Sequence, residues 1–378
     1  MNRIEFLSLD TLFFRDGSPF NANELQSGAL TCFPPSPQTL VGAIRASVAT
    51  GLGWNGRNRD SNWGHCCLDQ LGSGNDLGPL SFRGPFLFRN GEPLFPVPAD
   101  LLGVPPQSGG AGNGKAERPA KLVRLRPAAV PRECDLGAVR LPESPRDDVE
   151  GRKLLHPRWW MNMTGLNAVL QGDCPQVKDL IDDGELWHVE PRIGISRDPA
   201  TRTTREQALY APRHTRPTSG VCLNMFAEGL SQQACEGISA SQVQAVGGES
   251  RGCWLDVRDA ELTLPPTPKF AVADQKLRYS VLVLTPLATS SPPRPNEPFL
   301  GLPGTLVSAC LPRPQFWGGW DSLVNQPLPL TPHLAPGSVL YLEAGSNQSD
   351  DLLRWHGASL GDKCAWGFGA IALGTWKS

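Results

Sequence analysis

The sequence predicts a soluble α+β protein with many loops, and three observations lead to this class. The chain has 378 residues, which is long enough for two domains with cores of ordinary size. Its 40 glycines and 37 prolines favour turns and loops over long helices. Hydrophobic residues make up 40% and charged residues 19%, which is typical of a globular chain rather than a disordered tail or a coiled coil.

The N-terminal segment predicts a strand followed by a long connection and a helix. In "RIEFLSLDTLFF" the apolar Ile4, Phe6 and Leu9 alternate with charged and polar residues, as in a half-buried strand. Phe13 and Phe14 close this segment. Because successive side chains of a strand point to opposite faces, at most one of the two rings could meet a ligand, and a core position is favoured for them.

The helix is expected to begin after Ser36, a favourable N-cap residue, with proline at the first helical position. Apolar residues then recur at i, i+4 and i+8 and give one buried stripe: Leu40, Ile44 and Val48. Gly42 would permit close approach of another backbone. Helix N-termini carry unpaired amides, so this one, with Arg15 and Arg45 near it, is a candidate anion site. The alternative is an ordinary helix start with solvent-facing arginines.

A second candidate site is the hairpin predicted over residues 189–216. Ile193 and Ile195 alternate before a polar tip, "SRDPATRTTREQ", and "ALYA" resumes the apolar character. Between residues 190 and 216 there are six arginines and three acidic residues. Because arginine is suited to bidentate phosphate contacts, this pattern indicates a hairpin that grips a phosphate backbone. A second basic run, 115–132, holds six Lys or Arg and one Glu.

Two glycine-rich segments come before or at the start of apolar, strand-like stretches, "VGGESRGCWLDV" at 246–257 and "GDKCAWGFGAIALGTW" at 361–376. Glycine there would let a ligand approach the backbone. Trp366 and Phe368 could stack a base or pack in the core, and core packing is favoured. The run "KLRYSVLVLTPL" from Lys276 predicts a buried strand that restarts the pattern of the N-terminus, which places a boundary near 265.

Charge, cysteine usage and missing motifs exclude several classes. A formal charge of −2 argues against a broadly basic nucleic-acid binder, so any site for a polyanion is expected to be local. We expect no transmembrane span, no signal peptide, and ten reduced thiols in the cytoplasm. His65, Cys66 and Cys67 lack a second pair of ligands at motif spacing, so no metal is predicted, and nucleotide-binding glycine loops do not occur.

Eight signatures in order give the chain a resemblance to a known family. They are "LDTLFFRDGSPF", "FPPSPQTLVGAIR", "FRGPFLF" with "PLFPVPADLL", "EPRIGISRDPATRTT" with "ALY", "GGESR", "GGWD", "PGSVLYLE" and "GFGAIALGTW". Over residues 9–376 the chain resembles the RAMP-superfamily subunit of type III-B (Cmr) CRISPR effector complexes that binds the 5′ handle of the guide RNA.

The resemblance implies two ferredoxin-like (RRM-related) modules with long loop and hairpin insertions, at 1–265 and 266–378, and a thumb-like hairpin at about 189–216. It implies a non-catalytic RNA-binding subunit of an antiviral ribonucleoprotein, without cofactor or metal. The implied partners are the 5′ handle of the guide RNA, the large polymerase/cyclase-like subunit, which it docks, and the backbone RAMP subunit.

The same resemblance implies RNA contacts in four places: the turn after the first strand, the first helix, the hairpin and the glycine-rich segments. The residues are Arg15, Asp16, Ser36, Thr39, Arg45, Arg192, Arg197, Thr201, Arg202, Arg205, Gly247, Gly248, Arg251, Gly367 and Gly369.

Two other functions stay open on the residues alone. A metal-independent RAMP endoribonuclease that matures guide RNA needs a general base near the 2′-hydroxyl, for which His214 is the best candidate, with Asp198 in the same hairpin. An aspartate in an Arg-Asp-Pro turn is more often structural. The other alternative is an architectural subunit that contacts only protein.

Overall fold

The structure is a computed structural model that describes residues 1–15, 31–55, 65–106, 118–144, 152–198, 200–240, 243–321 and 326–377. The chain forms two compact units, each assembled from three segments. The first unit contains Met1–Asn90, Leu186–Glu261 and Phe316–Thr331, and the second contains Gly91–Glu185, Leu262–Gln315 and Pro332–Ser378. Residues 91–185 thus group with the C-terminal segments, and the predicted domains 1–265 and 266–378 stay a prediction.

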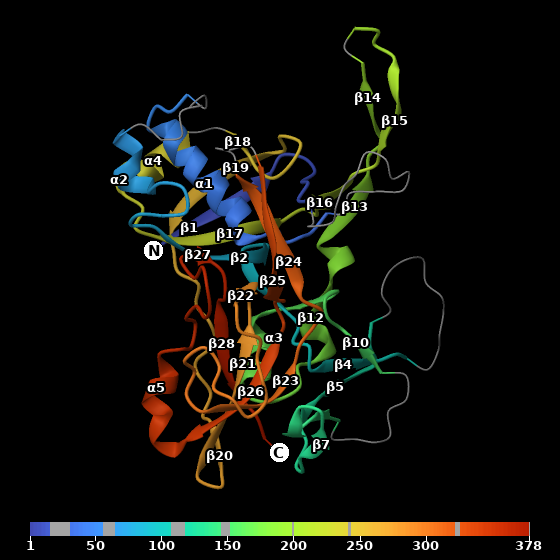
Figure 1. Ribbon diagram of the computed structural model, residues 1–378, viewed down its shortest axis with the longest axis vertical. Coiled ribbons are helices and arrows are strands. Elements are labelled where there is room, and N and C mark those ends of the chain that lie inside the picture. The colour runs from blue at the N-terminus through green and yellow to red at the C-terminus, as the bar shows by residue number, and fades with distance from the viewer. Residues whose placement is uncertain are drawn as a thin grey trace. The chain divides into compact units, whose positions relative to one another are not determined.

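The first unit consists of strands and three helices among the described residues (Figure 1). In chain order its elements are β1 (Asn2–Ser8), α1 (Pro37–Gly51), α2 (His65–Leu71), β2 (Ser81–Arg89), β13 (Trp187–Pro191), β14 (Gly194–Arg197), β15 (Thr204–Tyr210), β16 (Arg213–Pro217), β17 (Val221–Glu228), α4 (Gln232–Ala240), β18 (Gln244–Ala245), β19 (Gly252–Asp259) and most of β24 (Gln315–Asp321) and β25 (Gln326–Leu334).

The main sheet of the first unit has the strand order β19–β1–β17–β2, and every neighbouring pair is antiparallel. Phe6 of β1 lies opposite Leu255 on one side and Leu223 on the other. Helix α1 connects β1 to β2, and α4 connects β17 to β19. Counted along the chain, the four strands therefore lie in the order fourth, first, third, second, and each helix bridges two strands that are separated by a third.

Helix α1 begins and is buried as the sequence predicts. Pro37 is its first residue after Ser36, and the three predicted stripe residues Leu40, Ile44 and Val48 are fully buried. The expected close approach at Gly42 is wrong, because a Cβ there would meet nothing within 4 Å. The close contact lies at Gly51 instead, where a Cβ would come within 2.2 Å of the Gly237 Cα, so α1 and α4 cross at these two glycines.

The second unit is also mostly strand (Figure 1). Its elements are β3 (Glu92–Pro96), β4 (Leu101–Val104), β5 (Lys121–Arg124), β6 (Arg126–Pro127), β7 (Arg132–Cys134), β8 (Gly137–Val139), β9 (Pro142–Glu143), β10 (Lys153–Leu154), β11 (Trp159–Met161), α3 (Met163–Leu170), η1 (Val177–Asp179), β12 (Leu180–Asp182), η2 (Asp183–Glu185), β20 (Ala271–Ala273), β21 (Lys276–Val283), β22 (Leu287–Ala288), β23 (Thr305–Cys310), β26 (Val339–Gly345), η3 (Ser346–Gln348), α5 (Ser349–Leu353), β27 (Trp366–Gly367) and β28 (Ile371–Thr375).

The main sheet of the second unit repeats the strand order of the first. Strand β21 pairs with β26 and β28, and β23 pairs with β26, all antiparallel, which gives β28–β21–β26–β23. Counted from β21, this is again fourth, first, third, second. Helix α5 lies between β26 and β28, whereas the fully described connection 284–304 between β21 and β23 contains no helix.

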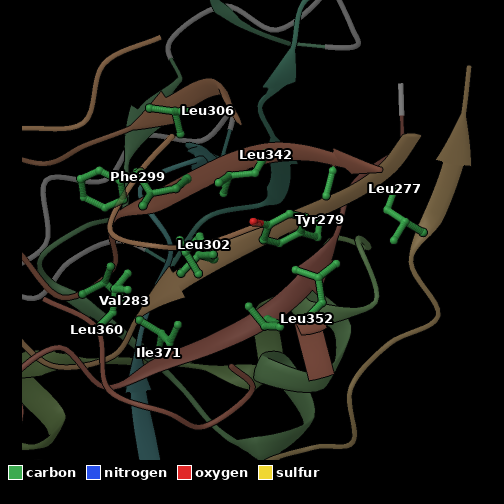
Figure 2. Close-up of a cluster of buried hydrophobic side chains, with 14 of the residues drawn as sticks. Leu277, Tyr279, Val283, Phe299, Leu302, Leu306, Leu342, Leu352, Leu360 and Ile371 are labelled. Carbon is green, nitrogen blue, oxygen red and sulfur yellow. The ribbon is translucent and has the colours of Figure 1, made fainter. Parts of the chain in front are cut away.

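The core of this second sheet gathers side chains from β21, β26, β28, α5 and the 284–304 connection (Figure 2). Tyr279 is fully buried, and its hydroxyl donates to the carbonyl oxygen of Pro303 over 2.5 Å. The strand predicted from Lys276 is confirmed, since every residue of β21 after Lys276 is buried. Each large apolar side chain buried here contributes about 1.5–3 kcal/mol to folding.

The structure confirms the α+β class and the scarcity of long helices, because the longest described helix, α1, has 15 residues. No described helix is long and apolar enough to cross a membrane. Cys67, Cys222, Cys253 and Cys310 are buried. The predicted first strand ends earlier than expected, at Ser8, and Leu12 makes an isolated bridge to Thr215.

Candidate nucleic-acid interface

The predicted hairpin is present and is built in two parts. Strand β13 pairs with β16 to form its base, and β14 pairs with β15 to form its distal part (Figure 1). Between the two parts the amide of Arg192 donates to the carbonyl oxygen of Pro212 over 2.9 Å, which continues the pairing. The polar tip predicted over residues 196–207 is shorter in the structure, because β14 extends to Arg197 and β15 begins at Thr204.

The base of the hairpin is docked on residues 10–13, which follow β1. Leu12 and Thr215 exchange backbone hydrogen bonds of 2.7 and 2.8 Å. The hydroxyl of Thr11 lies 3.0 Å from Nδ1 of His214, and the ring of Phe13 stacks on the same imidazole with ring centroids 5.2 Å apart. Phe13 and Phe14 are both buried, so the core interpretation of this aromatic pair is confirmed.

Three carboxylates and three guanidinium groups meet beside this docking contact, and we call them the Asp10 cluster: Asp10, Glu190, Arg192, Arg216, Glu249 and Arg251. Their side chains are between 21% and 47% exposed. Three positive and three negative groups leave the cluster with no net charge.

Asp10 lies at the centre of this cluster. Its carboxylate oxygens are 2.8 Å from Nη2 of Arg216, 3.1 Å from Nη2 of Arg192 and 3.6 Å from Nη1 of Arg251. Although burial by itself would raise the pKa of Asp10, hydrogen bonds from Arg216 and Arg192 lower it below its ordinary value. The carboxylate therefore stays charged when the three arginines are present.

The remaining acids pair with the same arginines. Glu190 of β13 hydrogen-bonds Arg216 of β16, and this contact, before all others, lowers the pKa of Glu190. Glu249 lies 3.2 Å from Nη2 of Arg251. Arg192 and Arg251, both predicted to contact RNA, are thus already paired with carboxylates of the chain.

The turn 247–251 has a strained backbone that holds Glu249 and Arg251 in place. Glu249 and Ser250 both have positive φ, of 55° and 51°, which is uncommon for residues with side chains. Gly247 also has positive φ, and a Cβ on Gly248 would lie 2.8 Å from the Phe13 ring. We expected these glycines to let a ligand approach, but the group that approaches them is the chain's own segment 13–14.

His214 and Asp198, the candidate general bases, have structural surroundings. His214 is fully buried, and its Nε2 lies 3.0 Å from Oε2 of Glu249. Burial is the main cause that lowers its pKa, so the imidazole is neutral near pH 7. Asp198 accepts hydrogen bonds from the amides of Thr201 and Ala200 over 3.0 and 2.9 Å, and these bonds lower its pKa.

The tip of the hairpin exposes an arginine. Arg202 is exposed, has φ of +58°, and donates its amide to the carbonyl oxygen of Asp198 over 2.8 Å. Thr201 hydrogen-bonds Thr203 between their hydroxyls over 2.8 Å. The side chains of Arg197 and Arg205, on β14 and β15, lie outside the side chains that the structure describes.

The start of α1 differs from the expectation at one residue. Ser36 is the N-cap residue, and its hydroxyl lies 3.3 Å from that of Thr39. Arg15 is exposed, and Asp16 lies outside the described residues. Arg45 is buried and donates from Nη1 to the carbonyl oxygen of Gly74 over 2.9 Å, so it supports the turn after α2 and does not face solvent.

The two predicted glycines near the C-terminus, Gly367 and Gly369, belong to the second unit and lie against other parts of that unit. Gly367 and Gly369 have positive φ, and a Cβ on Gly369 would lie 1.9 Å from the Leu360 carbonyl oxygen. Phe368 between them is fully buried against His333, with ring centroids 5.1 Å apart. Core packing, the favoured interpretation of this aromatic residue, is confirmed.

Three arginines of the second basic run form ion pairs within the second unit. Arg124 is buried and donates to Asp100, Arg118 lies 3.1 Å from Glu185, and Arg132 lies 2.7 Å from Glu143. In the part of the chain that the structure describes, no three His, Cys, Asp or Glu residues gather as metal ligands would. The side chains of His65 and Cys66 lie outside that part.

Sequence reasoning missed Asp10, Glu249 and Arg216 as members of the site. Each lies within or beside a motif, but nothing in the spacing shows that residues 10, 216 and 249 meet. The excess of arginine over acid in the hairpin pointed to the region, and the compensating carboxylate of Asp10 comes from a segment about 180 residues away in the sequence.

Comparison with known proteins adds four findings. A family model described as CRISPR-associated protein (Cas_Cmr3) matches residues 4–376. A chain in the cryo-EM structure of the type III-B Cmr-beta bound to cognate target RNA and AMPPnP, state 1, is similar with a TM-score of 0.49 and 17% identity, over 90% of this chain and 86% of that chain. A chain in the crystal structure of the Csm1-Csm4 cassette in complex with AMPPNP has a TM-score of 0.37 and 9% identity, over 91% of this chain and 88% of that chain. A search of the curated proteins finds no match.

Proposed function

The chain belongs to the CRISPR-associated Cas_Cmr3 family, and from this premise we propose that it is a non-catalytic RNA-binding subunit of a type III-B effector complex. In this role it anchors the 5′ handle of the guide RNA and docks the large polymerase/cyclase-like subunit, next to the backbone RAMP subunit. We also infer that its two main sheets are ferredoxin-like modules, since both have the fourth, first, third, second strand order of a split βαβ arrangement. The second module lacks its first helix.

The hairpin supports RNA binding most directly. At its base, Arg192 and Arg216 are balanced by Asp10 and Glu190. Residues 194–213, which run from β14 to the first residue of β16, hold four arginines and two acids, an excess of two positive charges. One of the two acids, Asp198, is used by backbone amides of its own turn. The unbalanced charge therefore lies in the distal part and at Arg213 next to it, which is where a phosphate backbone would be gripped.

We accordingly assign the RNA contacts in the hairpin to its distal residues Arg197, Thr201, Arg202 and Arg205, together with Arg15 and the Ser36–Thr39 helix start. The surroundings of Arg45 favour a structural role for that residue. Gly247, Gly248 and Gly369 act through the close packing that they permit, and Gly367 through its positive φ. The burial of His214 and the turn contacts of Asp198 support a subunit that does not cut RNA.

Purification of the chain with the products of its genomic neighbours tests this proposal. We expect co-purified short RNAs that share one constant 5′ end, and crosslinks from that end to residues 194–210. A complex without RNA would favour the architectural alternative. RNA without a common 5′ end would contradict the handle-binding role.

A further inference from the structure

The hairpin meets the first sheet through contacts of two kinds. The first kind is buried and short in range. It consists of the two backbone hydrogen bonds between Leu12 and Thr215 and the stack of Phe13 on His214. The Asp10 cluster lies beside them, is partly exposed, and consists mainly of ion pairs between its acids and arginines. Trp187 at the start of β13 also packs edge-on against Phe33, with ring centroids 4.9 Å apart. The cluster adds ion pairs beside these contacts, and such a lateral connection restricts the direction in which the hairpin can point.

Asp10 supplies this lateral contact to three separate segments. Arg192 follows β13, Arg216 belongs to β16, and Arg251 precedes β19. One carboxylate therefore joins both strands of the hairpin base to the strained turn that leads into the sheet. Glu190 pairs with Arg216 across the hairpin base, and Glu249 contacts Arg251 and His214 of β16, so Asp10 is the acid of the cluster that contacts all three segments.

We propose that Asp10 is a positioning residue that fixes the direction of the 187–217 hairpin on the first sheet, and that Arg192, Arg216 and Arg251 hold the hairpin rather than contact phosphate. For its effect on RNA, this inference rests on the proposed function. The cluster has three charges of each sign, so it offers a polyanion no net attraction. Its guanidinium groups are instead held in fixed directions by carboxylates.

The sign of one substitution separates positioning from direct contact. Asp10→Asn removes a negative charge beside three arginines. If these arginines contacted phosphates directly, RNA would bind more tightly, because the competing carboxylate is gone and the local charge is more positive. If Asp10 positions the hairpin, RNA binds more weakly although the charge has become more favourable.

The experiment compares wild type with Asp10→Asn, Asp10→Glu and Asp256→Asn in the assembled complex. Asp256 pairs with Arg258 on the same strand at 2.6 Å. Asp256→Asn therefore makes the same change of charge but breaks an ion pair within one strand instead of a contact between separate segments. Amide hydrogen exchange is measured over residues 10–15 and 211–217. Affinity is measured with RNA extracted from the wild-type complex and labelled at its 3′ end.

We expect faster exchange at Leu12 and Thr215 and about fivefold weaker RNA binding for Asp10→Asn, as for the loss of several partly exposed ion pairs. Asp10→Glu keeps the carboxylate, so its exchange rates and its RNA affinity should be close to those of wild type. Asp256→Asn should behave like wild type in both measurements. Unchanged exchange in Asp10→Asn would overturn the positioning role. Faster exchange with equal or tighter RNA binding would show that the hairpin direction does not serve RNA. If wild type yields no RNA, the proposed function fails, and exchange still decides whether Asp10 holds the hairpin.

Discussion

The backbone amide of Gly248 donates a hydrogen bond to the carbonyl oxygen of Phe13 over 2.8 Å. This bond holds the turn 247–251 against the segment that follows β1, at a distance that only glycine permits. A Cβ on Gly247 would lie 2.5 Å from the same Phe13 oxygen, and the φ of Gly247 is +75°. The two segments that carry Asp10 and Arg251 are therefore joined by backbone as well as by charge.

Gly247→Ala is expected to lower the free energy of unfolding by about 1–3 kcal/mol, because a Cβ would be strained in φ and would overlap the Phe13 oxygen. Gly42→Ala is the matched control. Gly42 is exposed inside α1 with nothing near its Cβ position. Alanine there should raise the free energy of unfolding by about 0.5–1 kcal/mol. Urea unfolding of both variants measures the difference, and equal midpoints would contradict the assignment.

Asp100→Ala is expected to destabilise the second unit by about 3–5 kcal/mol, because it leaves a buried guanidinium without its carboxylate. Arg124 donates from Nε to Asp100 over 2.7 Å, both side chains are at most 5% exposed, and the Tyr341 hydroxyl also donates to Asp100. Arg132→Ala breaks an exposed pair with Glu143 and should cost less than about 1 kcal/mol. A similar loss in both variants, measured by urea unfolding, would show that burial does not distinguish the two pairs.

The free energy of unfolding should fall when the pH is lowered from about 7.5 to about 5.5. These two values lie on either side of the ordinary histidine pKa of about 6.5. Burial, as the main cause, lowers the pKa of His156, His214 and His356 in the folded chain. The unfolded chain therefore takes up protons first as the pH falls, and stability is lost below the unfolded pKa.

His356→Gln should flatten this dependence of stability on pH. Nδ1 of His356 accepts from the Leu373 amide over 3.2 Å while Nε2 lies 2.8 Å from the Pro265 carbonyl oxygen, an arrangement that only the neutral ring satisfies. Urea midpoints at both pH values are the measurement. The same slope in wild type and variant would exclude this histidine as a contributor.

His214→Ala and Asp198→Ala, made separately, should leave guide maturation and target cleavage by the assembled complex unchanged. His214 has no exposed surface, and Asp198 is occupied by the amides of its own turn. Cleavage rates are compared per intact complex, so that any loss of assembly is counted separately. Loss of either cleavage in a fully assembled variant would overturn the non-catalytic assignment.

Arg202→Ala should weaken guide RNA of any sequence to a similar extent and flatten the salt dependence of binding, because each phosphate contact adds to the slope. Arg45→Ala is the comparison variant. It should lower stability by about 1–3 kcal/mol, because the buried Arg45 loses its hydrogen bond to the Gly74 carbonyl oxygen, and the salt slope should stay unchanged. Isolated chain and complex are both titrated, and tighter binding is expected with the large subunit present, since the chain has a net charge of −2.

Local patterns were sufficient for many of the elements. The Ser36–Pro37 start and the i, i+4 spacing of Leu40 and Ile44 predict α1 because capping and helical periodicity act within a few turns. The hairpin over 187–217 and strand β21 follow from alternation, apolar runs and turn residues in the same way. The ordered signatures also indicated the family to which the chain belongs.

What the sequence by itself determined is therefore the α+β class, the start of α1, the hairpin, the core positions of Phe13, Phe14 and Phe368, and the family. Only the tertiary structure decided which charges are balanced. Arg45 is buried on the Gly74 carbonyl oxygen, and Arg192, Arg216 and Arg251 share Asp10. Pairing of charges depends on distances of a few ångströms between segments far apart in the chain, and residue spacing along the sequence carries no record of those distances.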